Sequence, residues 1–546
     1  MGGELSRSAK SQYETRESLT AARGSILAKD ASPLAVGEEK FLIFASIPEL
    51  SGNLAKTSEK LAENLISNDD MGEVSVKQKI LDEKKRISAI LTRKDVTWVP
   101  IKNKVDREIK EKIEGFKIPG LGFETQEARA YPEASSSAHI LGFVGKNEGG
   151  EDVGYFGLEG HYDLALSAKP GYVSRESDAY GAPLLTGLSN EVNPVGGVDL
   201  ITHIDKRIQI LAEERLVVGM QKYGAPAGVV IIADPATGAI LASASYPSYD
   251  PAKYSLYSDE LFKNPAVSFS FEPGSIFKLL VMAAAIDSGV ITPETKCDIC
   301  ARPLRVDKYV IRTWNDTYRP DSTMTDVLVN SDNVGMAAVA QKLGADKLFD
   351  YLTAFGIGKP TGIDLQGEAS PPLRERGTWS IVDVSTAGFG QGVAVTPIQI
   401  VKAVSTLARG GTSVTPQVVD RIRGEGWEED IKPLVVDRVV SKKASQEVTA
   451  MMVEAAKKGE AKWTHLSGFK VAGKTGTAQI PIAGHYDSEN TIASFVGFAP
   501  ADKPRFVMLT ILREPASSPW ASETAAPLWY SIAKDLFVYF GIQPEN

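Results

Sequence analysis

The strongest constraint on the fold of this chain is an apolar run at residues 276–286, Ile-Phe-Lys-Leu-Leu-Val-Met-Ala-Ala-Ala-Ile. Only Lys278 interrupts it. A helix that is apolar on all sides has no face to present to water, so it must lie inside a core that the rest of the chain provides. The 546 residues are more than one compact domain usually contains, and we expect two or three domains.

The overall composition argues against several classes of protein. Hydrophobic residues make up 43% and charged residues 24%, as in ordinary globular proteins. The net charge of −9 repels phosphate, so nucleic acid is not an expected partner. No stretch approaches the roughly 18 apolar residues of a membrane-spanning helix, and the opening residues lack the apolar core of a signal peptide. We expect either a cytosolic protein or one whose N-terminal anchor lies outside this chain.

The character of the sequence changes near residue 190, where we expect the main domain boundary. Upstream, residues 105–117 predict a helix that stops at Gly115, and residues 139–145 predict a strand. Residues 193–197, Asn-Pro-Val-Gly-Gly, are typical of a linker. Downstream we predict a strand at 198–205, a helix at 206–222, a hairpin of strands at 228–233 and 239–245, an exposed acidic loop at 424–430, paired strands at 493–499 and 505–512, and a closing helix at 524–540.

The two cysteines, Cys297 and Cys300, form a Cys-x-x-Cys pair. In a cytosolic protein this spacing suggests redox chemistry or half of a zinc site. No second cysteine pair completes four ligands, and the five histidines are scattered along the chain. We therefore favour a small-loop disulfide or two free thiols over a metal site.

Ser275 follows a Pro-Gly dipeptide and stands at the N-terminus of the buried helix. Lys278 lies three positions on, which puts both side chains on one helix face, roughly 5–6 Å apart between Cβ atoms. Burial lowers the pKa of a lysine, and a neutral amine can take the proton of a serine hydroxyl and make it a nucleophile. The helix N-terminus also directs backbone N–H groups toward a developing oxyanion. Ser-x-x-Lys alone is a weak signal, because Ser531 and Lys534 match it in an amphipathic helix where we expect a surface lysine.

A second motif is Ser331-Asp-Asn333. Ser-x-Asn is common, and residues 51–53 and 488–490 match it too. An isolated case is usually a turn or a helix cap.

A third motif, Lys474-Thr475-Gly476-Thr477, lies inside a strand-like segment at 469–480. Gly476 would let a ligand approach the backbone closely. Lys474, Thr475 and Thr477 could then hold a carboxylate.

The same region also matches a phosphate-binding P-loop, Gly-x4-Gly-Lys-Thr, at residues 468–475. A P-loop needs a helix that starts at the Lys-Thr pair. The four residues between the glycines look like strand, and Gly476 and Pro481 oppose a following helix. Nucleotide binding is therefore not expected.

The three motifs occur together in the order that is typical of class A β-lactamases and penicillin-binding proteins. No histidine lies near any of them in the sequence, which disfavours a Ser-His-Asp triad. Over nearly its whole length the chain resembles class B penicillin-binding proteins. The segments that carry this resemblance are 22–35, 129–132, 139–145 and 157–160 in the N-terminal part, and 234–238, 355–358, 361–364, 390–392, 396–397 and 495–500 in the C-terminal part.

The resemblance implies an α+β fold in two parts. Residues 1–190 would form an elongated, non-catalytic pedestal of the dimerisation type. Residues 191–546 would form a penicillin-binding, β-lactamase-like transpeptidase domain, with a mostly antiparallel sheet flanked by helices and the catalytic serine on a buried helix.

The resemblance also implies a role for each residue of the three motifs. Ser275 would be the nucleophile, Lys278 its proton acceptor, and Ser331 the relay of a proton to the leaving amine. Asn333 would hydrogen-bond the substrate peptide. In the third motif Lys474 and Thr475, aided by Thr477, would hold the terminal carboxylate of a D-Ala-D-Ala stem peptide beside Gly476, and the backbone N–H groups of Ser275 and Thr477 would form the oxyanion hole.

The expected reaction is D,D-transpeptidation of peptidoglycan stem peptides through an acyl-enzyme that β-lactams also form. No metal or organic cofactor is expected. The family implies a location on the extracytoplasmic face of the bacterial membrane and a membrane glycosyltransferase as partner. The membrane anchor of that family does not precede Arg23 and Gly24 in this sequence, and we expect that the anchor was removed from this chain. The cysteine pair is not part of the family pattern, although a disulfide is chemically permitted outside the cytoplasm.

Alternatives to transpeptidation remain at this point. A class A β-lactamase needs a glutamate-positioned water for deacylation, and residues 334–473 hold no Glu-x-x-Leu-Asn motif for it. A D,D-carboxypeptidase differs only in using water as the acceptor. A β-lactam sensor would pass its signal through a membrane segment, and a scaffold of the wall-synthesis complex would be expected to lose at least one motif.

Overall fold

The computed structural model describes residues 14–19, 21–66, 76–176, 189–482 and 485–545. The chain forms two compact units, each assembled from separate stretches. The first takes the described parts of Met1–Ser25, Ala35–Tyr131 and Ala168–Gly197, and the second takes Ile26–Leu34, Pro132–Ser167 and Val198–Asn546. The functional division near residue 190 stays a prediction.

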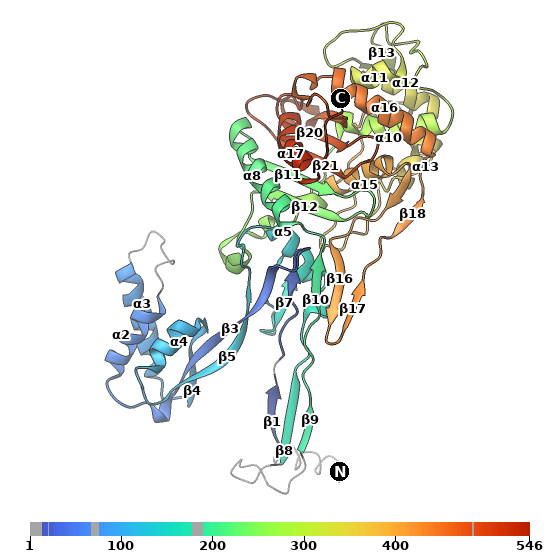
Figure 1. The fold of residues 1–546 in the computed structure, drawn as a ribbon. Coiled ribbons are helices and arrows are strands. Elements are labelled where there is room, and N and C mark those ends of the chain that lie inside the picture. The colour runs from blue at the N-terminus through green and yellow to red at the C-terminus, as the bar shows by residue number, and fades with distance from the viewer. Residues whose placement is uncertain (1–13, 20, 67–75, 177–188, 483–484, 546) are drawn as a thin grey trace. The chain divides into compact units, whose positions relative to one another are not determined.

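The first unit contains an antiparallel sheet in which β3 pairs with both β4 and β5 (Figure 1). Three helices contribute to its core, where Ile43 of β3 packs with Leu61, Ile87 and Ile113. A second antiparallel sheet has the order β1-β8-β9. The elements are β1 (Glu14–Leu19), β3 (Pro33–Ser46), α2 (Leu54–Leu65), α3 (Val76–Leu91), β4 (Trp98–Val105), α4 (Arg107–Glu114), β5 (Leu121–Ala130), β8 (Gly171–Glu176) and β9 (Ser189–Val192).

Two local predictions in the N-terminal part have different outcomes. The helix predicted at 105–117 is α4, and Gly115 is its C-cap as expected. The strand predicted at 139–145 is wrong in its first half, because residues 138–141 form helix α5 and only β6 (Phe143–Lys146) is extended. Gly142, with φ 76°, makes the turn between them, and a Cβ there would lie 2.2 Å from the carbonyl oxygen of Phe156.

The second unit is built on an antiparallel five-stranded sheet of order β12-β11-β21-β20-β19, which leaves β19 at an edge. Figure 1 labels four of these strands, β11, β12, β20 and β21. The strands of the sheet are β11 (Ala227–Ala233), β12 (Ile240–Tyr246), β19 (Ala472–Ile482), β20 (His485–Ala499) and β21 (Phe506–Arg513). This sheet confirms the predicted hairpin and the predicted pair of strands near the end.

Both faces of this sheet are covered. Met508 and Leu512 of β21 pack in one core with α8 (Lys206–Tyr223) and α17 (Ala525–Tyr539), which confirms both predicted helices. Leu509 and Ile511 point to the opposite face by strand alternation and are also buried. The other helices of this unit are α5 (Ala138–Leu141), α6 (Gly157–His161), α7 (Asp163–Leu166), α9 (Pro265–Ser268), α10 (Lys278–Asp287), α11 (Met324–Val329), α12 (Asn333–Leu343), α13 (Ala345–Ala354), α14 (Ile381–Ala387), α15 (Pro397–Ala408) and α16 (Lys442–Lys458).

A smaller sheet in the same unit contains β2 (Ile26–Leu27), β10 (Asp199–Thr202), β16 (Val419–Gly424) and β17 (Trp427–Asp430). Strand β10 confirms only residues 199–202 of the strand predicted at 198–205, and the acidic loop predicted at 424–430 is wrong. Its side chains are exposed as expected, yet a tight turn at Glu425 and Gly426 sends β17 back along β16. There the acidic residues face the arginines of β16, so opposite charges stabilise the hairpin: Arg421 forms an ion pair with Glu428.

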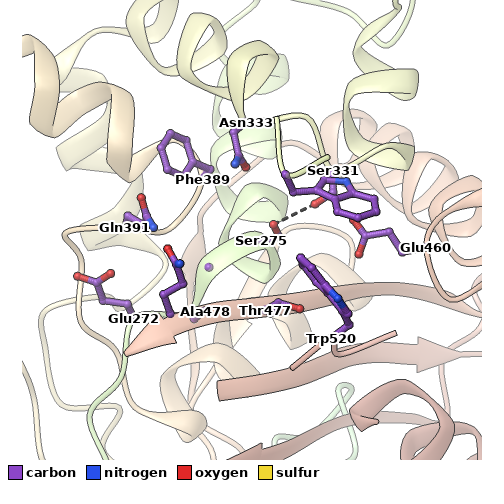
Figure 2. Close-up of a pocket in the computed structure, with 13 residues that line it drawn as sticks. Glu272, Ser275, Ser331, Asn333, Phe389, Gln391, Glu460, Thr477, Ala478 and Trp520 are labelled. Carbon is purple, nitrogen blue, oxygen red and sulfur yellow. Dashed lines mark hydrogen bonds between the residues drawn. The ribbon is translucent and has the colours of Figure 1, made fainter. Parts of the chain in front are cut away.

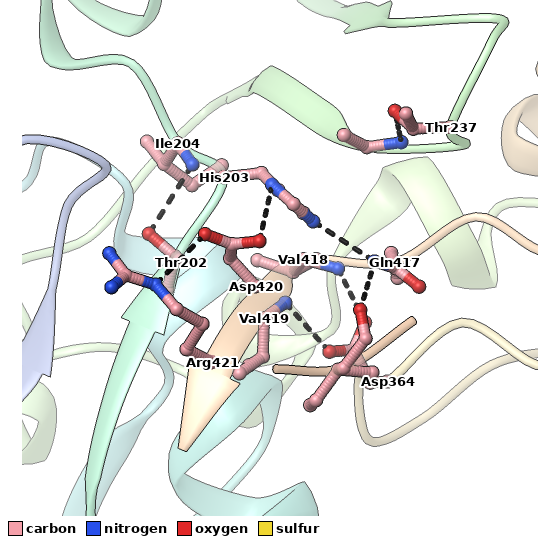
Figure 3. Close-up of polar contacts among 12 residues, drawn as sticks. Thr202, His203, Ile204, Thr237, Asp364, Gln417, Val418, Val419, Asp420 and Arg421 are labelled. Carbon is pink, nitrogen blue, oxygen red and sulfur yellow. Dashed lines mark hydrogen bonds and ion pairs between the residues drawn. The ribbon is translucent and has the colours of Figure 1, made fainter. Parts of the chain in front are cut away.

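His203 follows β10 and joins this sheet to neighbouring loops (Figure 3). Its Nε2 lies 3.0 Å from Gln417 Nε2, and its Nδ1 lies 3.7 Å from Asp420 Oδ1. Asp364 accepts hydrogen bonds from the backbone N–H groups of Val418 and Val419 at 2.6 and 2.9 Å. These contacts fix the start of β16.

The remaining strands form short pairs: β6 with β7 (Asp152–Tyr155), β13 (Leu304–Val306) with β14 (Tyr309–Ile311), and β15 (Thr412–Val414) with β18 (Val435–Arg438). Cys297 and Cys300 are joined by a disulfide. Within the described ranges, no cluster of three or more His, Cys, Asp or Glu side chains could hold a metal ion. None of the helices described is long and apolar enough to cross a membrane.

Candidate active site

Ser275 lies in a single 3-10 turn, Gly274–Phe277, that leads directly into α10. The buried helix predicted from the sequence is confirmed, and Lys278 at its start has 0% of its surface exposed. Gly274 has φ 55°, a conformation that favours glycine. A Cβ on Gly274 would lie only 3.1 Å from the carbonyl oxygen of Thr477, so this turn presses closely against β19.

Ser331 stands between α11 and α12, and its hydroxyl is the centre of the site (Figure 2). Its Oγ donates a hydrogen bond of 2.9 Å to Ser275 Oγ. The same atom accepts hydrogen bonds from Lys278 Nζ at 3.2 Å and from Lys474 Nζ at 3.0 Å. Asp332 caps α12 by accepting from two backbone N–H groups, which holds the segment in place.

Lys278 is buried among acceptors that come from the second motif. Its Nζ donates to Ser331 O at 2.7 Å and to Asn333 Oδ1 at 2.7 Å, besides the Ser331 hydroxyl. Among the described contacts its acceptors do not include Ser275 Oγ, so the two residues are linked through Ser331. Burial, and then the positive charge of Lys474, holds the pKa of Lys278 well below the ordinary 10.5.

Lys474 enters the site from β19, and its side chain is 3% exposed. Besides Ser331, it donates to the carbonyl and hydroxyl oxygens of Thr475, both at 3.2 Å. Burial lowers the pKa of Lys474, while the charge of Glu460 opposes that shift. Glu460 also accepts a hydrogen bond from the Thr475 hydroxyl at 3.0 Å.

Gly476 and Thr477 bring the edge strand against the serine turn. A Cβ on Gly476 would lie 2.6 Å from Ser494 Oγ and 2.8 Å from Ile276 Cγ2, so the contact requires glycine. The hydroxyl of Thr477 accepts from the backbone N–H of Ala521 at 3.1 Å. β19 continues to Ile482 without a helix after Lys474, as the rejection of the P-loop required. The strand predicted from residue 469 begins only at Ala472, so three of the four residues between the glycines lie outside it.

All the predicted site residues therefore meet at one place. Ser275, Ser331, Asn333 and Thr477 line a cleft of about 540 Å³ that is open to solvent (Figure 2). The other predicted members of the motifs are buried. The described lining includes no histidine. The lining residues that the structure describes are Glu272, Gly274, Ser275, Trp314, Ser331, Asn333, Phe389, Gln391, Glu460, Thr477, Ala478, Gln479 and Trp520.

Sequence reasoning missed several of these side chains. Trp314 and Trp520 contact each other at the cleft with tilted rings whose centroids are 5.3 Å apart, although they come from distant segments. Glu460 follows α16 and no local pattern marks it. Two others had a signal: Glu272 lies two residues before the turn that begins at Gly274, and Gln391 is the middle residue of the Gly-Gln-Gly segment at 390–392.

This arrangement supplies the parts of a serine acyl-transfer site. A serine hydroxyl is hydrogen-bonded through a second hydroxyl to two buried amines whose pKa values are lowered. An amine that is neutral at working pH can accept the serine proton.

Comparison with known protein families agrees with this geometry. Residues 228–536 match the penicillin binding protein transpeptidase domain, and residues 18–202 match the penicillin-binding protein dimerisation domain. The chain belongs to the class B penicillin-binding proteins. The family resemblance and the α+β fold class inferred from the sequence are thereby confirmed.

Among the relatives of this penicillin-binding protein is stage V sporulation protein D of Bacillus subtilis. It is 31% identical over 551 residues, which cover 100% of this chain and 82% of the relative. Peptidoglycan D,D-transpeptidase FtsI of Escherichia coli K12 is 28% identical over 452 residues, which cover 82% of this chain and 73% of that protein.

Solved structures share the fold. Penicillin binding protein 2X from Streptococcus thermophilus superposes with a TM-score of 0.77 at 23% identity, over 97% of this chain and 83% of that one. Penicillin binding protein 3 from Mycobacterium tuberculosis, in complex with ampicillin, gives a TM-score of 0.73 at 24% identity, over 97% of each chain.

Proposed function

We propose that this protein is a serine D,D-transpeptidase, which cross-links peptidoglycan stem peptides through an acyl-enzyme on Ser275 and is acylated there by β-lactams. The observation that carries the proposal is the hydrogen-bonded connection from Ser275 Oγ through Ser331 Oγ to the buried amines of Lys278 and Lys474. Family membership supports it, since relatives are named peptidoglycan D,D-transpeptidases.

In the acylation step Ser275 Oγ attacks the carbonyl carbon of the penultimate D-alanine. A hydroxyl can both donate and accept, so the hydrogen bonds around Ser331 can reverse and pass the serine proton to Lys278. The C–N bond to the terminal D-alanine then breaks. Ser331 returns a proton to the leaving amine, and an ester between Ser275 and the donor peptide remains.

The developing negative charge would be held by the backbone N–H groups of Ser275 and Thr477. Two features support this assignment. Ser275 stands at the start of the helical turn, where N–H groups lack helical partners. β19 is an edge strand, so the side of its backbone that faces the serine turn is not paired within the sheet.

The terminal carboxylate of the stem peptide would be bound by Lys474 together with the hydroxyls of Thr475 and Thr477. Glu460 favours the charged form of Lys474, which suits a carboxylate partner. Asn333 would bind the donor peptide, because its side chain lines the cleft while its Oδ1 is held by Lys278. These steps need only side chains and backbone, without a cofactor.

The wider assignments follow from the family. We infer that residues 1–190 serve as the non-catalytic pedestal and that residues 191–546 carry the chemistry. We also infer a site of action on the extracytoplasmic face of the bacterial membrane and a membrane glycosyltransferase as partner, since cross-linking needs newly made glycan strands beside the enzyme.

The test is intact-protein mass spectrometry after incubation with a penicillin. One stable adduct is expected on the wild type and none on Ser275→Ala. Absence of an adduct at high penicillin concentration would contradict the proposal. Rapid loss of the adduct would point to a β-lactamase, and release of D-alanine without any product joined to an added amine would point to a carboxypeptidase.

A further inference from the structure

Glu272 is a carboxylate in the cleft that none of the proposed steps uses. It lies three residues before Ser275 and lines the same cleft. Figure 2 shows Glu272 and Gln391 on one side of Ser275 and Glu460 on the other. The cleft therefore has two acidic ends, and only the Glu460 end lies beside the lysines.

The backbone around Glu272 is held firmly. Phe271 and Val395 exchange two backbone hydrogen bonds of 3.0 and 2.9 Å, and Gly274 N donates to Gly390 O at 3.2 Å. A Cβ on Gly390 would lie 2.2 Å from Gly274 O, so the two segments can approach this closely only with glycine there. A carboxylate placed on such a frame keeps a constant position relative to the serine turn.

The charge of Glu272 is incompletely balanced. Its carboxylate accepts from the backbone N–H of Gly392 at 3.0 Å and from the hydroxyl of Tyr486 at 3.1 Å. Both donors are neutral, and in the described part of the chain no cation pairs with it. Burial accordingly raises the pKa of Glu272. A carboxylate can accept about four hydrogen bonds, so it has capacity for a cationic donor from a ligand.

The second half of transpeptidation brings a cation into this cleft. The acceptor stem peptide attacks through an amine, and an aliphatic amine with a pKa near 10 arrives as an ammonium at neutral pH. We propose that Glu272 binds the ammonium group of the acceptor and so favours amine over water in deacylation. This inference rests on the transpeptidase function proposed above, and Glu272 acts in it as a specificity-determining residue.

The chemical step balances as follows. The ammonium loses one proton to solvent, and the neutral nitrogen attacks the carbonyl carbon of the Ser275 ester. A C–N bond forms and the bond to Ser275 Oγ breaks. The second proton lost by the nitrogen restores the Ser275 hydroxyl, and Ser331 lies within hydrogen-bond distance to carry it.

The first test needs no variant. Nα-acetyl-D-lysine amide carries one ammonium, and its Nε-acetylated form carries none. Ligand-observed NMR with the penicilloylated wild type should show line broadening for the charged probe that is at least about fivefold greater than for the neutral one. Equal responses, or no response to the charged probe, would overturn the proposal.

The second test measures how the acyl-enzyme formed from a thioester donor partitions between an amine and water. Glu272→Gln keeps the size and the acceptor oxygen of the side chain and removes the charge. We expect the ratio of aminolysis to hydrolysis with the charged lysine probe to fall about tenfold, while the ratio with hydroxylamine, which is uncharged at neutral pH, stays within twofold.

Two controls separate the possible explanations. Glu375→Gln, at an exposed carboxylate outside the cleft lining, should leave both ratios unchanged. An equal fall with hydroxylamine would assign Glu272 a structural role and refute ammonium binding. A fall in the penicillin acylation of Glu272→Gln as large as the fall in its aminolysis would likewise refute ammonium binding. Failure of the wild type itself to form an adduct would instead refute the proposed function.

Discussion

The hydroxyl of Ser331 donates to the hydroxyl of Ser275 across 2.9 Å and lies between two buried lysine amines. Ser331 has a left-handed backbone with φ 55°, an uncommon conformation for a serine. Its main chain also binds Lys278 through the carbonyl oxygen. One residue thus connects the nucleophile with the proposed proton acceptor Lys278 and with Lys474, and most of the testable chemistry depends on it.

Replacing Ser331 with alanine should slow acylation strongly. The substitution removes the only described hydrogen-bonded link between Ser275 and the amines. Loss of a positioned proton-transfer group typically costs about 10²- to 10⁴-fold. We expect a loss in that range for the second-order rate of acylation by a fluorescent penicillin. Ser51→Ala, in the exposed Ser-x-Asn match at 51–53, is the matched control and should react at the wild-type rate.

The pH dependence of acylation should report Lys278. Burial and the charge of Lys474 lower its pKa, so the neutral, proton-accepting form appears below the ordinary value of 10.5. The rate of acylation should therefore increase as the pH rises through that lowered pKa, and it should become constant before pH 10.5. A rate that does not change from acid to alkaline pH would contradict this role.

Lys278→Arg tests the same role without removing the charge. A guanidinium stays protonated at all working pH values and cannot accept the serine proton. We expect acylation to fall by about 10³-fold, within the range for a lost general base. Lys534→Arg, at the exposed lysine of the Ser-x-x-Lys match in α17, should leave the rate unchanged. Near-normal acylation of Lys278→Arg would exclude Lys278 as the proton acceptor.

Gly476→Ala should separate β19 from the serine turn. The new methyl group would lie 2.6 Å from Ser494 Oγ and 3.1 Å from Pro273 O. Relieving such contacts costs roughly 1–3 kcal/mol of stability, and moving the strand displaces Lys474 and Thr477. We expect a lower melting temperature and acylation reduced at least tenfold. Gly196→Ala, where a Cβ meets only an ordinary contact at 3.8 Å, should change neither quantity.

The free energy of unfolding should fall in acid partly because of His139, a residue outside the three motifs. The histidine is 4% exposed, and its Nε2 donates to Leu261 O at 2.9 Å. Burial lowers its pKa from 6.5 to about 4. The unfolded chain then binds more protons between these values, so stability falls as pH drops from 6.5 to about 4, by about 3 kcal/mol in total.

The check is urea unfolding of the wild type and His139→Gln across that pH range. The glutamine can still donate to Leu261 but does not titrate. Its free energy of unfolding should decline less steeply with falling pH than that of the wild type. Burial also lowers the pKa of His203, whose neighbours include Asp420, Asp364, Lys29 and Asp234, so both proteins should retain part of the decline. Parallel curves would contradict the assignment to His139.

The parts of the fold that sequence could predict are those with a dense local signal. The apolar run at 276–286 fits only a buried helix, and the short apolar runs at 228–233, 239–245, 493–499 and 505–512 predict strands of the large sheet. The segment at 139–145 failed because one glycine at positive φ divides it between two elements. The prediction of a loop at 424–430 was wrong because it rested on the acidic side chains and overlooked the short turn at Glu425 and Gly426.

The motif residues of the site could be predicted because family patterns mark them, whereas the link through Ser331 could not. Spacing alone placed Lys278 beside Ser275, and only the folded chain brings the serine turn and β19 to the hydroxyl of Ser331. Glu460, Trp314 and Trp520 come from three distant segments without any local signature. Their contribution depends on tertiary packing, which periodicity does not encode.

The position of β21 in the large sheet has a consequence for how the protein is made. β11 pairs with β12 as soon as the hairpin exists, but its other neighbour is β21, with Val229 opposite Ile511. During synthesis the hairpin must wait with one hydrogen-bonding edge unpaired until nearly the whole chain has been translated. Unpaired edges recruit strands from other chains. The yield of active enzyme therefore depends on protecting this edge from neighbouring nascent chains until β21 arrives.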